Sequence, residues 1–347
     1  MQIIIFLYRL FDCFKIIFEA MKKTIALITG GFTGESVISI KSADFVSSKL
    51  DKEKFDFYKI VITPQSWYYE DHELVKTEVN RNDFSIELAE LTIRFDAAFI
   101  VLHGSPGEDG KLQGYLDMLH IPYTSCNALT SALTMNKGYT KAIVDDIEDL
   151  FVAKSVLLFE NSPLNIHKIT TTLKLPYFIK PNNGGSSIGM SKVKTIDELA
   201  DALEKAFLED SQVLVEEFIN GREFSVGIYK NNGGIEVLPA TEVISPKEFF
   251  DFEAKYTPGM TEEITPARMT NFERKRVVEI VTKAYEKLNC QGMVRIDYFL
   301  EHETGNFYFV EINTIPGQTE TSFIPQQVKA AGKNIVDFYT ELIETVC

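Results

Sequence analysis

Met293-Val-Arg295-Ile-Asp297 and Phe309-Val-Glu311-Ile-Asn313 decide the fold of the C-terminal part of this chain. In each run apolar and polar residues alternate with a period of two, which predicts a strand with one buried face. Between the runs, Glu303-Thr-Gly-Asn306 has the composition of a hairpin turn. The sequence therefore predicts an antiparallel hairpin with four polar side chains on one side of the sheet: Arg295, Asp297, Glu311 and Asn313.

This polar face favours a metal site. Carboxylate and amide oxygens are the ligands that Mg²⁺ prefers, and Mg²⁺ commonly bridges phosphates in proteins. The alternative is a hairpin whose polar face meets solvent. We prefer the metal site because the chain leaves the second strand through Asn313-Thr-Ile-Pro-Gly317, an irregular turn where an ordinary strand would continue.

Length and charge limit the possible classes of protein. A chain of 347 residues suggests two or three domains. The net charge of -15 argues against nucleic acid or an anionic membrane surface as a partner. The four cysteines are far apart without a C-x-x-C pair, which favours reduced thiols in a cytoplasmic protein.

The first twenty residues are apolar but do not form an unbroken membrane-spanning run. Four charged residues interrupt them: Arg9, Asp12, Lys15 and Glu19. We therefore expect no stable membrane insertion. Because a second methionine, Met21, directly precedes the first expected strand, we interpret residues 1–20 as a disordered extension from an upstream start.

Residues 21–124 have the pattern of an N-terminal α/β domain with a parallel sheet. Strands are expected at 25–29, 57–63 and 96–102, with a helix at 37–50 and another between the second and third strands. Functional loops should lie at the carboxyl ends of these strands. Glu35 and His103 occupy two such loops.

The rest of the chain divides into a central segment, 125–217, and a C-terminal α+β segment, 218–347. The central segment should contain a helix at 132–145, strands at 153–159 and up to Pro181, and a helix at 196–208. The C-terminal segment should contain helices at 271–288 and 334–345. Its long polar excursion, 245–266, is typical of a functional lid.

The stretch 180–191, Lys-Pro-Asn-Asn-Gly-Gly-Ser-Ser-Ile-Gly-Met-Ser, is the second signal. Glycine N–H groups and hydroxyls can surround phosphate oxygens. Lys180 ends the preceding strand and Lys137 is a second candidate cation, so we favour a phosphate site over a plain hairpin loop. Neither the P-loop nor the Rossmann glycine pattern is present.

Carboxylates follow the strand at 213–215. Glu216, Glu217 and Glu223 could accept hydrogen bonds from an adenine amino group and ribose hydroxyls. Each alone could also be a solvated surface residue. His103, before a glycine loop, is a candidate site residue, and a structural histidine is the alternative.

Taken together, these motifs resemble the D-alanine–D-alanine ligase family. The resemblance rests on stretches that occur in the family's order: Gly30-Gly-Phe-Thr-Gly-Glu35, His103-Gly104 through Glu108-Asp-Gly110, Met135-Asn-Lys137, Lys180 through Ser191, Glu253-Ala-Lys-Tyr256, Arg295-Ile-Asp297 and Glu311 through Gly317. It implies a three-domain ATP-grasp fold with ATP between the central and C-terminal domains. It also implies a homodimer.

The resemblance implies roles around the nucleotide. Lys137 and Lys180 would contact the phosphates of ATP, while Glu216 and Glu223 would bind adenine and ribose. Two Mg²⁺ (or Mn²⁺) ions would be held by Asp297, Glu311 and Asn313.

It also implies roles around two D-alanines. Glu35 would bind the first ammonium group and His103 would lie near the first carboxylate. The other implied residues are Lys255 and Ser322 at the second carboxylate, Ser186 and Tyr256 in a hydrogen-bonded group with Glu35, and Arg295 and the N–H of Gly317 at the oxyanion.

Three residues depart from the family pattern. Val37 stands where the family usually has a second acidic residue, and Asn136 replaces a commoner aspartate. Phe323 follows Ser322 where leucine is common beside the second-substrate pocket. The resemblance as a whole implies synthesis of D-alanyl-D-alanine for peptidoglycan through D-alanyl phosphate. Because of these departures, a D-serine or D-lactate acceptor is an alternative. An inactive nucleotide-binding module is another.

Overall fold

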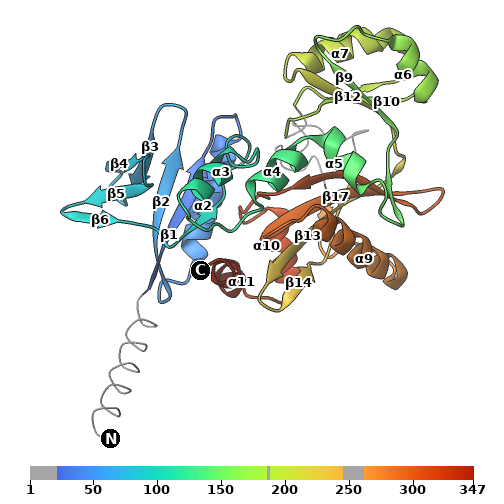
Figure 1. The fold of residues 1–347 in the computed structure, drawn as a ribbon. Helices are drawn as coiled ribbons and strands as arrows, with labels where there is room; N and C mark the ends of the chain where they lie inside the picture. The colour runs from blue at the N-terminus through green and yellow to red at the C-terminus, as the bar shows by residue number, and fades with distance from the viewer. Residues whose placement is uncertain (1–21, 186–187, 245–261) are drawn as a thin grey trace, which may run out of the picture.

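The computed structural model describes residues 22–185, 188–244 and 262–347. The expectations for residues 1–20, for Ser186, Lys255 and Tyr256, and for most of the 245–266 segment lie outside these ranges. Within them the chain forms three sheets, and Figure 1 shows the first (blue and cyan) beside the other two.

The first sheet has seven strands in the order β6-β5-β4-β3-β2-β1-β7. Their bounds are β1 Lys23–Gly30, β2 Phe55–Ile62, β3 Trp67–Glu70, β4 Lys76–Asn80, β5 Ser85–Leu88, β6 Leu91–Ile93 and β7 Ala97–Ile100. The expected parallel core is present, because β1 pairs in parallel with both β2 and β7. From β2 to β6 each strand pairs antiparallel with the next.

The prediction of a helix between the second and third parallel strands is wrong, because residues 67–93 form the strands β3 to β6 instead. Trp67-Tyr-Tyr-Glu70 is rich in aromatic side chains that favour strands. The turn after β4 is closed by Asn80, whose Oδ1 accepts the N–H of Asn82 at 3.1 Å. Connections this short join antiparallel strands, so the segment extends the sheet as hairpins.

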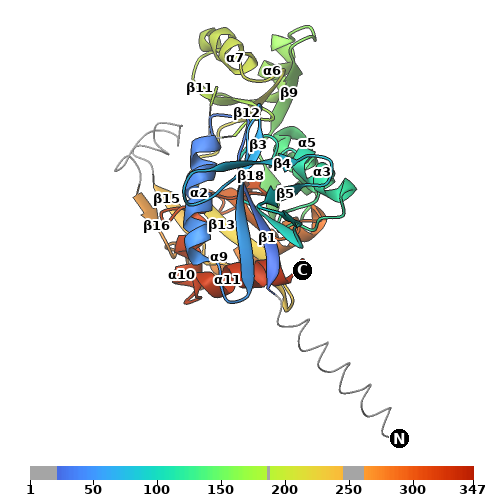
Figure 2. The ribbon, with the colours of Figure 1, turned by 90° about the vertical axis from the view of Figure 1, so that its left-hand side faces the viewer.

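Helices cover both faces of the first sheet. Ile25 and Leu27 of β1 pack with α2 (Ser36–Lys49) and α11 (Ile335–Glu344) on one face. Ala26 and Ile28 point the other way and pack with α3 (Lys111–Met118). Figure 2 shows blue α2 and red α11 in this layer. The C-terminal helix thereby joins the first sheet to the third.

The second sheet is small and antiparallel, with the order β11-β10-β12-β9. Its elements are β9 Ser155–Phe159, α6 Ile166–Thr172, β10 Tyr177–Pro181, β11 Ser191–Val193, η1 Ile196–Glu198, α7 Leu199–Phe207 and β12 Gln212–Glu217. It has its own core, in which Leu199 and Leu203 of α7 pack on Ile179 and Val215.

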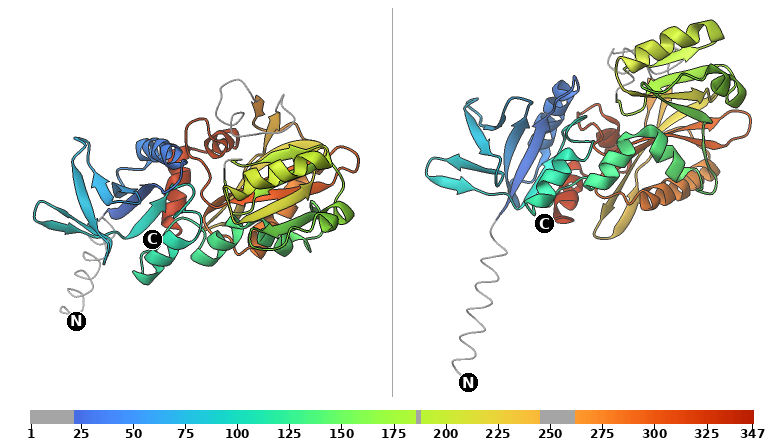
Figure 3. Two further views of the ribbon diagram at one scale, coloured as in Figure 1. Left: turned by 90° about the horizontal axis from the view of Figure 1, so that it is seen from above. Right: turned by 45° about the horizontal axis from the view of Figure 1, so that its top comes forward.

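The third sheet has the order β16-β15-β13-β17-β18-β8, with β14 paired to β13. Its strands are β8 Leu150–Val152, β13 Gly221–Asn231, β14 Gly234–Val237, β15 Thr241–Ile244, β16 Glu262–Ile264, β17 Met293–Glu301 and β18 Phe307–Asn313. Its helices are α4 Ala128–Met135, α5 Lys137–Val144, α9 Asn271–Lys287 and α10 Phe323–Ala330. Figures 1 and 3 show the second sheet lying over the third.

Residues 126–152 pack with the third sheet, although the sequence groups them with the central segment. β8 pairs in parallel with β18, and Cys126, Val144 and Leu150 are buried in the same core as β17 and α9. Long-range packing determines this placement, because no local sequence pattern in residues 126–152 indicates which distant strand they will pair with.

The single helix expected at 132–145 is two helices, α4 and α5, that meet at Asn136. Asn136 has an extended backbone and its Oδ1 accepts the N–H of Tyr139 at 3.0 Å, which starts a new helix. The break turns Lys137 and Lys141 of α5 toward the second sheet.

In the described part of the chain, none of the helices combines the length and the apolar character needed to cross a membrane.

Candidate active site

The β17–β18 hairpin brings its four polar side chains to one face of the third sheet, as the sequence predicts. Arg295 lies opposite Asn313 and Asp297 opposite Glu311 in the antiparallel ladder. On the other face, Val294, Ile296 and Ile312 are buried under α9. Strand alternation therefore separates the core from the polar site.

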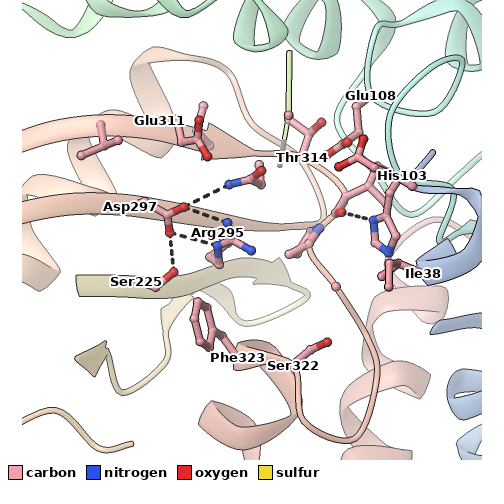
Figure 4. Close-up of a pocket in the computed structure, with 18 of the residues that line it drawn as sticks. Ile38, His103, Glu108, Ser225, Arg295, Asp297, Glu311, Thr314, Ser322 and Phe323 are labelled. Atoms are coloured by element: carbon pink, nitrogen blue, oxygen red, sulfur yellow. Dashed lines mark hydrogen bonds and ion pairs between the residues drawn. The ribbon is translucent and has the colours of Figure 1, made fainter. Parts of the chain in front are cut away.

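Asp297 is held by several donors, as Figure 4 shows. Arg295 donates from Nε to Oδ1 at 2.9 Å and from Nη2 to Oδ2 at 2.8 Å, a forked pair that fixes both groups. Ser225 of β13 donates its hydroxyl to the same carboxylate, and Asn313 donates from Nδ2 at 3.3 Å. Desolvation lowers the pKa of the partly buried Arg295 guanidinium, but the charges of Asp297 and Glu311 outweigh it and raise the pKa, so Arg295 stays charged.

Two adjoining cavities open between the second and third sheets. The hairpin cavity has a volume of about 680 Å³. It brings together most of the described residues that the sequence singled out: Glu35, His103, Lys137, Lys180, Glu223, Arg295, Asp297, Glu311, Asn313, Gly317, Ser322 and Phe323. The outer cavity, about 770 Å³, shares Lys180 and Glu223 with it and adds Glu216 and Glu217.

Three lysines form the wall opposite the hairpin: Lys137, Lys141 and Lys180. Lys137 donates to the carbonyl of Gly184 in the glycine loop, and its Nζ lies 3.4 Å from Oε2 of Glu311. Burial and the two neighbouring ammonium groups hold the pKa of Lys141 well below its ordinary range. Lys141 was not among the residues predicted from the sequence, although its i, i+4 spacing from Lys137 places both on one helix face.

Glu216 lies between two of these lysines. Its carboxylate is 2.6 Å from Nζ of Lys180 and also contacts Nζ of Lys141, and it is almost fully buried. The neighbouring Glu217 accepts the N–H of Lys174 at 2.9 Å. Glu216 thus neutralises part of the lysine cluster, a contact that the sequence analysis did not foresee.

Glu35 reaches from the start of α2 into the gap between two glycine loops. A Cβ at Gly104 would lie 2.7 Å from its Oε2, and a Cβ at Gly185 would lie 3.0 Å from its Oε1. Gly104 also has a φ of 68°, which favours glycine. The two glycines therefore leave room for the Glu35 carboxylate at the cavity.

His103 is buried, and its ring is bound from two sides. Burial lowers its pKa, so the ring is neutral. Nδ1–H donates to the carbonyl of Ile315 at 2.8 Å, and Nε2 accepts from the Ser42 hydroxyl at 3.0 Å. In this structure both ring nitrogens have protein partners, and the ring joins α2 to the segment after β18.

Glu108 is a second carboxyl in the cavity wall, and no role was assigned to it from sequence although it belongs to a quoted motif. Its Oε2 accepts the N–H of Gly104 at 2.7 Å. Burial, together with the charge of Glu35, raises the pKa of Glu108 to about 8. At neutral pH the Glu108 carboxyl beside Gly104 is therefore mostly protonated.

Gly317, Ser322 and Phe323 form the floor of the hairpin cavity. Ser322 precedes α10, and its hydroxyl accepts the N–H of Thr319 at 2.9 Å. The Phe323 ring lies 5.5 Å from the guanidinium carbon of Arg295. A Cβ at position 317 would come within 2.9 Å of the Ser322 hydroxyl, so a side chain there would force Ser322 to move.

The donor set fits hard divalent cations. Asp297, Glu311 and Asn313 all line the same cavity and offer oxygen atoms, which Mg²⁺ and Mn²⁺ accept as ligands. Lys137 and Lys180 line the same cavity and could neutralise the charge of a bound polyanion.

Solved structures with the same fold define the class of this protein. The structure is similar to that of the D-Ala:D-Ser ligase VanG from Enterococcus faecalis, with a TM-score of 0.84 and 34% identity over 94% of this chain and 99% of that chain. D-alanyl-alanine synthetase A from Vibrio cholerae has a TM-score of 0.82 and 28% identity over 93% and 98% of the two chains. The fold is that of the ATP-grasp ligases.

Sequence relatives specify the family. The D-ala D-ala ligase N-terminus model matches residues 24–126, and the C-terminus model matches residues 152–344. The D-alanine--D-alanine ligase of Parabacteroides distasonis is 44% identical over 324 residues, covering 93% of this chain and 97% of the relative. The corresponding protein of Azobacteroides pseudotrichonymphae is 42% identical over 93% of this chain and its whole length. This chain belongs to the D-alanine–D-alanine ligase family.

Proposed function

We propose that this protein joins two D-alanines into D-alanyl-D-alanine with ATP, as a cytoplasmic step of peptidoglycan precursor synthesis. The observation that carries the proposal is the hairpin cavity, whose lining brings the carboxylates of Asp297 and Glu311 together with the lysines, Glu35 and Arg295. Family membership over nearly the whole chain supports it. A homodimer is part of the proposal, as the family resemblance implies.

ATP would occupy both cavities. Its adenosine would lie in the outer cavity near Glu216, Glu217 and Glu223, and its phosphates would extend to Lys137 and Lys180. Two Mg²⁺ (or Mn²⁺) ions held by Asp297, Glu311 and Asn313 would neutralise phosphate charge as the phosphoryl group moves.

The reaction needs an activated carboxyl group, because an amine does not attack a carboxylate directly. Transfer of the γ-phosphoryl group to the first D-alanine would give D-alanyl phosphate with a good leaving group. Glu35 would hold the ammonium of this first substrate. The glycine loop and the lysine wall would keep the phosphates in line and exclude water.

The second D-alanine would attack as a free amine and create a tetrahedral oxyanion. Arg295 is charged, partly buried and oriented by Asp297, so it suits stabilisation of this charge together with the N–H of Gly317. Ser322 and Phe323 would contact the second substrate. Roles for Ser186, Lys255 and Tyr256 remain part of the proposal through the family motif alone.

A D-serine acceptor is the second candidate. The likeness to a D-Ala:D-Ser ligase and the aromatic ring of Phe323 at the cavity floor favour it. A D-lactate acceptor would also use the same activated intermediate, with a hydroxyl as the attacking group.

One assay tests these assignments. Phosphate release is measured with ATP and D-alanine, with L-alanine as the control, and the product is identified by mass spectrometry. We expect phosphate release with D-alanine only, and D-alanyl-D-alanine as the main product when D-serine and D-lactate compete. A dominant mixed product would contradict the acceptor assignment, and ATP binding without D-alanine-dependent phosphate release would indicate an inactive nucleotide-binding module.

A further inference from the structure

Side-chain amides connect the first turn of α5 to the glycine loop after β10. We call the set of five residues that makes this connection the amide relay: Asn136, Asn182, Asn183, Asp210 and Gln212. All five are described by the structure, and none of them lines either cavity. The relay therefore acts behind the site and not in contact with a ligand.

Asp210 fixes the direction of the relay at one end. Its carboxylate, which can only accept, takes the backbone N–H of Asn183 at 2.6 Å, Nδ2 of Asn183 at 2.9 Å and the N–H of Gln212 at 3.0 Å. The Asn183 amide is thereby turned so that its Oδ1 faces Asn136. A donor is required at that point, and Asn136 supplies it from Nδ2 at 2.8 Å.

The first turn of α5 fixes the other end. The N–H of Tyr139 donates to Oδ1 of Asn136 at 3.0 Å, and the N–H of Gly138 donates to Oδ1 of Asn182 at 2.8 Å. Both amides therefore point Nδ2 at one acceptor, Oε1 of Gln212, at 3.1 and 2.9 Å. Asn136 and Asn182 are buried, so a reversed amide would leave polar atoms unpaired at a substantial cost.

The relay holds two phosphate-facing segments together. The N–H of Lys137 donates to the carbonyl of Asn182 at 3.0 Å, and Nζ of Lys137 donates to the carbonyl of Gly184. α5 packs in the core of the third sheet, whereas the glycine loop leaves the second sheet. The relay is thus a polar connection between two separately packed parts of the site.

We propose that Asn136 is a positioning residue, which acts through the amide relay to hold Lys137 and the loop at 182–185 as one phosphate-binding unit. An amide is needed at position 136 because Asn183 and Gln212 both present oxygen atoms to it. The inference rests on the proposed function only in taking nucleotide phosphate as the ligand of Lys137.

Asn136→Asp is the sharpest test, because helix capping and the relay predict opposite results. Aspartate caps a helix as well as asparagine does, and its charge suits a helix N-terminus. In the relay, however, a carboxylate oxygen at position 136 would replace the Nδ2 donor and face two other acceptors, Oδ1 of Asn183 and Oε1 of Gln212. We expect ADP affinity, measured by calorimetry, to fall about tenfold, the equivalent of about one net hydrogen bond, while adenosine affinity is retained.

Two further variants make the result interpretable. Asn165→Asp is the matched control, because Asn165 also caps a helix through Oδ1, at α6, but is exposed and lines neither cavity. It should bind ADP within about twofold of the wild type. Asp210→Asn places an amide donor against backbone donors at the far end of the relay. It should weaken the binding of ADP but not the binding of adenosine. It also serves as the test if Asn136→Asp fails to fold.

The inference is overturned if Asn136→Asp, or Asp210→Asn in its place, binds ADP as the wild type does, or loses ADP and adenosine affinity equally. The latter result would indicate general loss of structure. These measurements need no turnover. A wild type that releases no phosphate with D-alanine would therefore refute the proposed function while leaving the comparison of ADP with adenosine valid.

Discussion

The two walls of the hairpin cavity carry opposite charges and are built in different ways. Asp297 and Glu311 lie on neighbouring strands of one sheet, so their spacing follows from the register of a single ladder. Lys137 and Lys180 come from α5 and β10, whose buried residues belong to two separate cores. The carboxylates are therefore positioned by local structure, whereas the lysines meet only if the second and third sheets are correctly placed.

The wall formed by Asp297 and Glu311 is the anionic wall. Removal of one of its carboxylates should have the largest effect on activity. For Glu311→Ala we expect kcat to fall on the order of 10³-fold, because a charged group that the phosphoryl transfer requires is lost. Dipeptide formation at saturating ATP and D-alanine measures it. Glu303→Ala, in the exposed turn of the same hairpin, is the control and should keep its activity. Unchanged Mg-ATP affinity and turnover in Glu311→Ala would mean that the polar face is merely solvated.

Replacement of the arginine on the same wall should have the next largest effect. Arg295→Lys keeps the positive charge but loses the planar fork that binds both oxygens of Asp297. We expect kcat to fall about 10²-fold, with a smaller change in the KM for ATP. Equal activity of the two proteins would show that charge alone, without orientation, suffices on this wall.

Glu216→Gln tests the cationic wall. The change leaves Lys141 and Lys180 without the carboxylate between them, and breaking a buried ion pair from one side typically costs about 3 kcal/mol of the free energy of unfolding. Denaturant unfolding measures this loss. If Glu216 acts mainly on adenine, as the family resemblance implies, the variant would instead keep its stability and lose its preference for ATP over GTP.

These outcomes would show how much of the site local sequence can specify. The hairpin was predictable because a period of two over five residues is a local signal. Lys141 could have been predicted as a site residue from its i, i+4 spacing on α5, but its contact with Glu216 depends on packing between distant elements. The strands β3 to β6 were mistaken for a helix because each is short and only partly alternating. Nothing local indicates that β8 joins β18.

The smallest expected effect concerns pH and Glu108, which lies beside Gly104 in the cavity lining. The folded-state pKa of this carboxyl is about 8, above the ordinary value of 4.5, so between these values the folded protein binds more protons than the unfolded chain. Stability should therefore fall as pH rises through this range. In Glu108→Gln, which cannot titrate, we expect a flatter dependence of the thermal midpoint on pH. Parallel curves for the two proteins would contradict the raised pKa.

The path of the chain between the second and third sheets has a consequence for modularity. The chain enters the second sheet at 153–154 and leaves it at 218–220, and Ser155 pairs with Glu216 in adjacent strands. The ends of the inserted segment are therefore about one strand spacing apart, roughly 4.8 Å. Because that segment has its own core, a tight turn in place of residues 155–217 should leave the remaining strand order intact. The second sheet should therefore be removable as a unit, and exchange between homologous proteins at these two crossings should yield folded chimaeras.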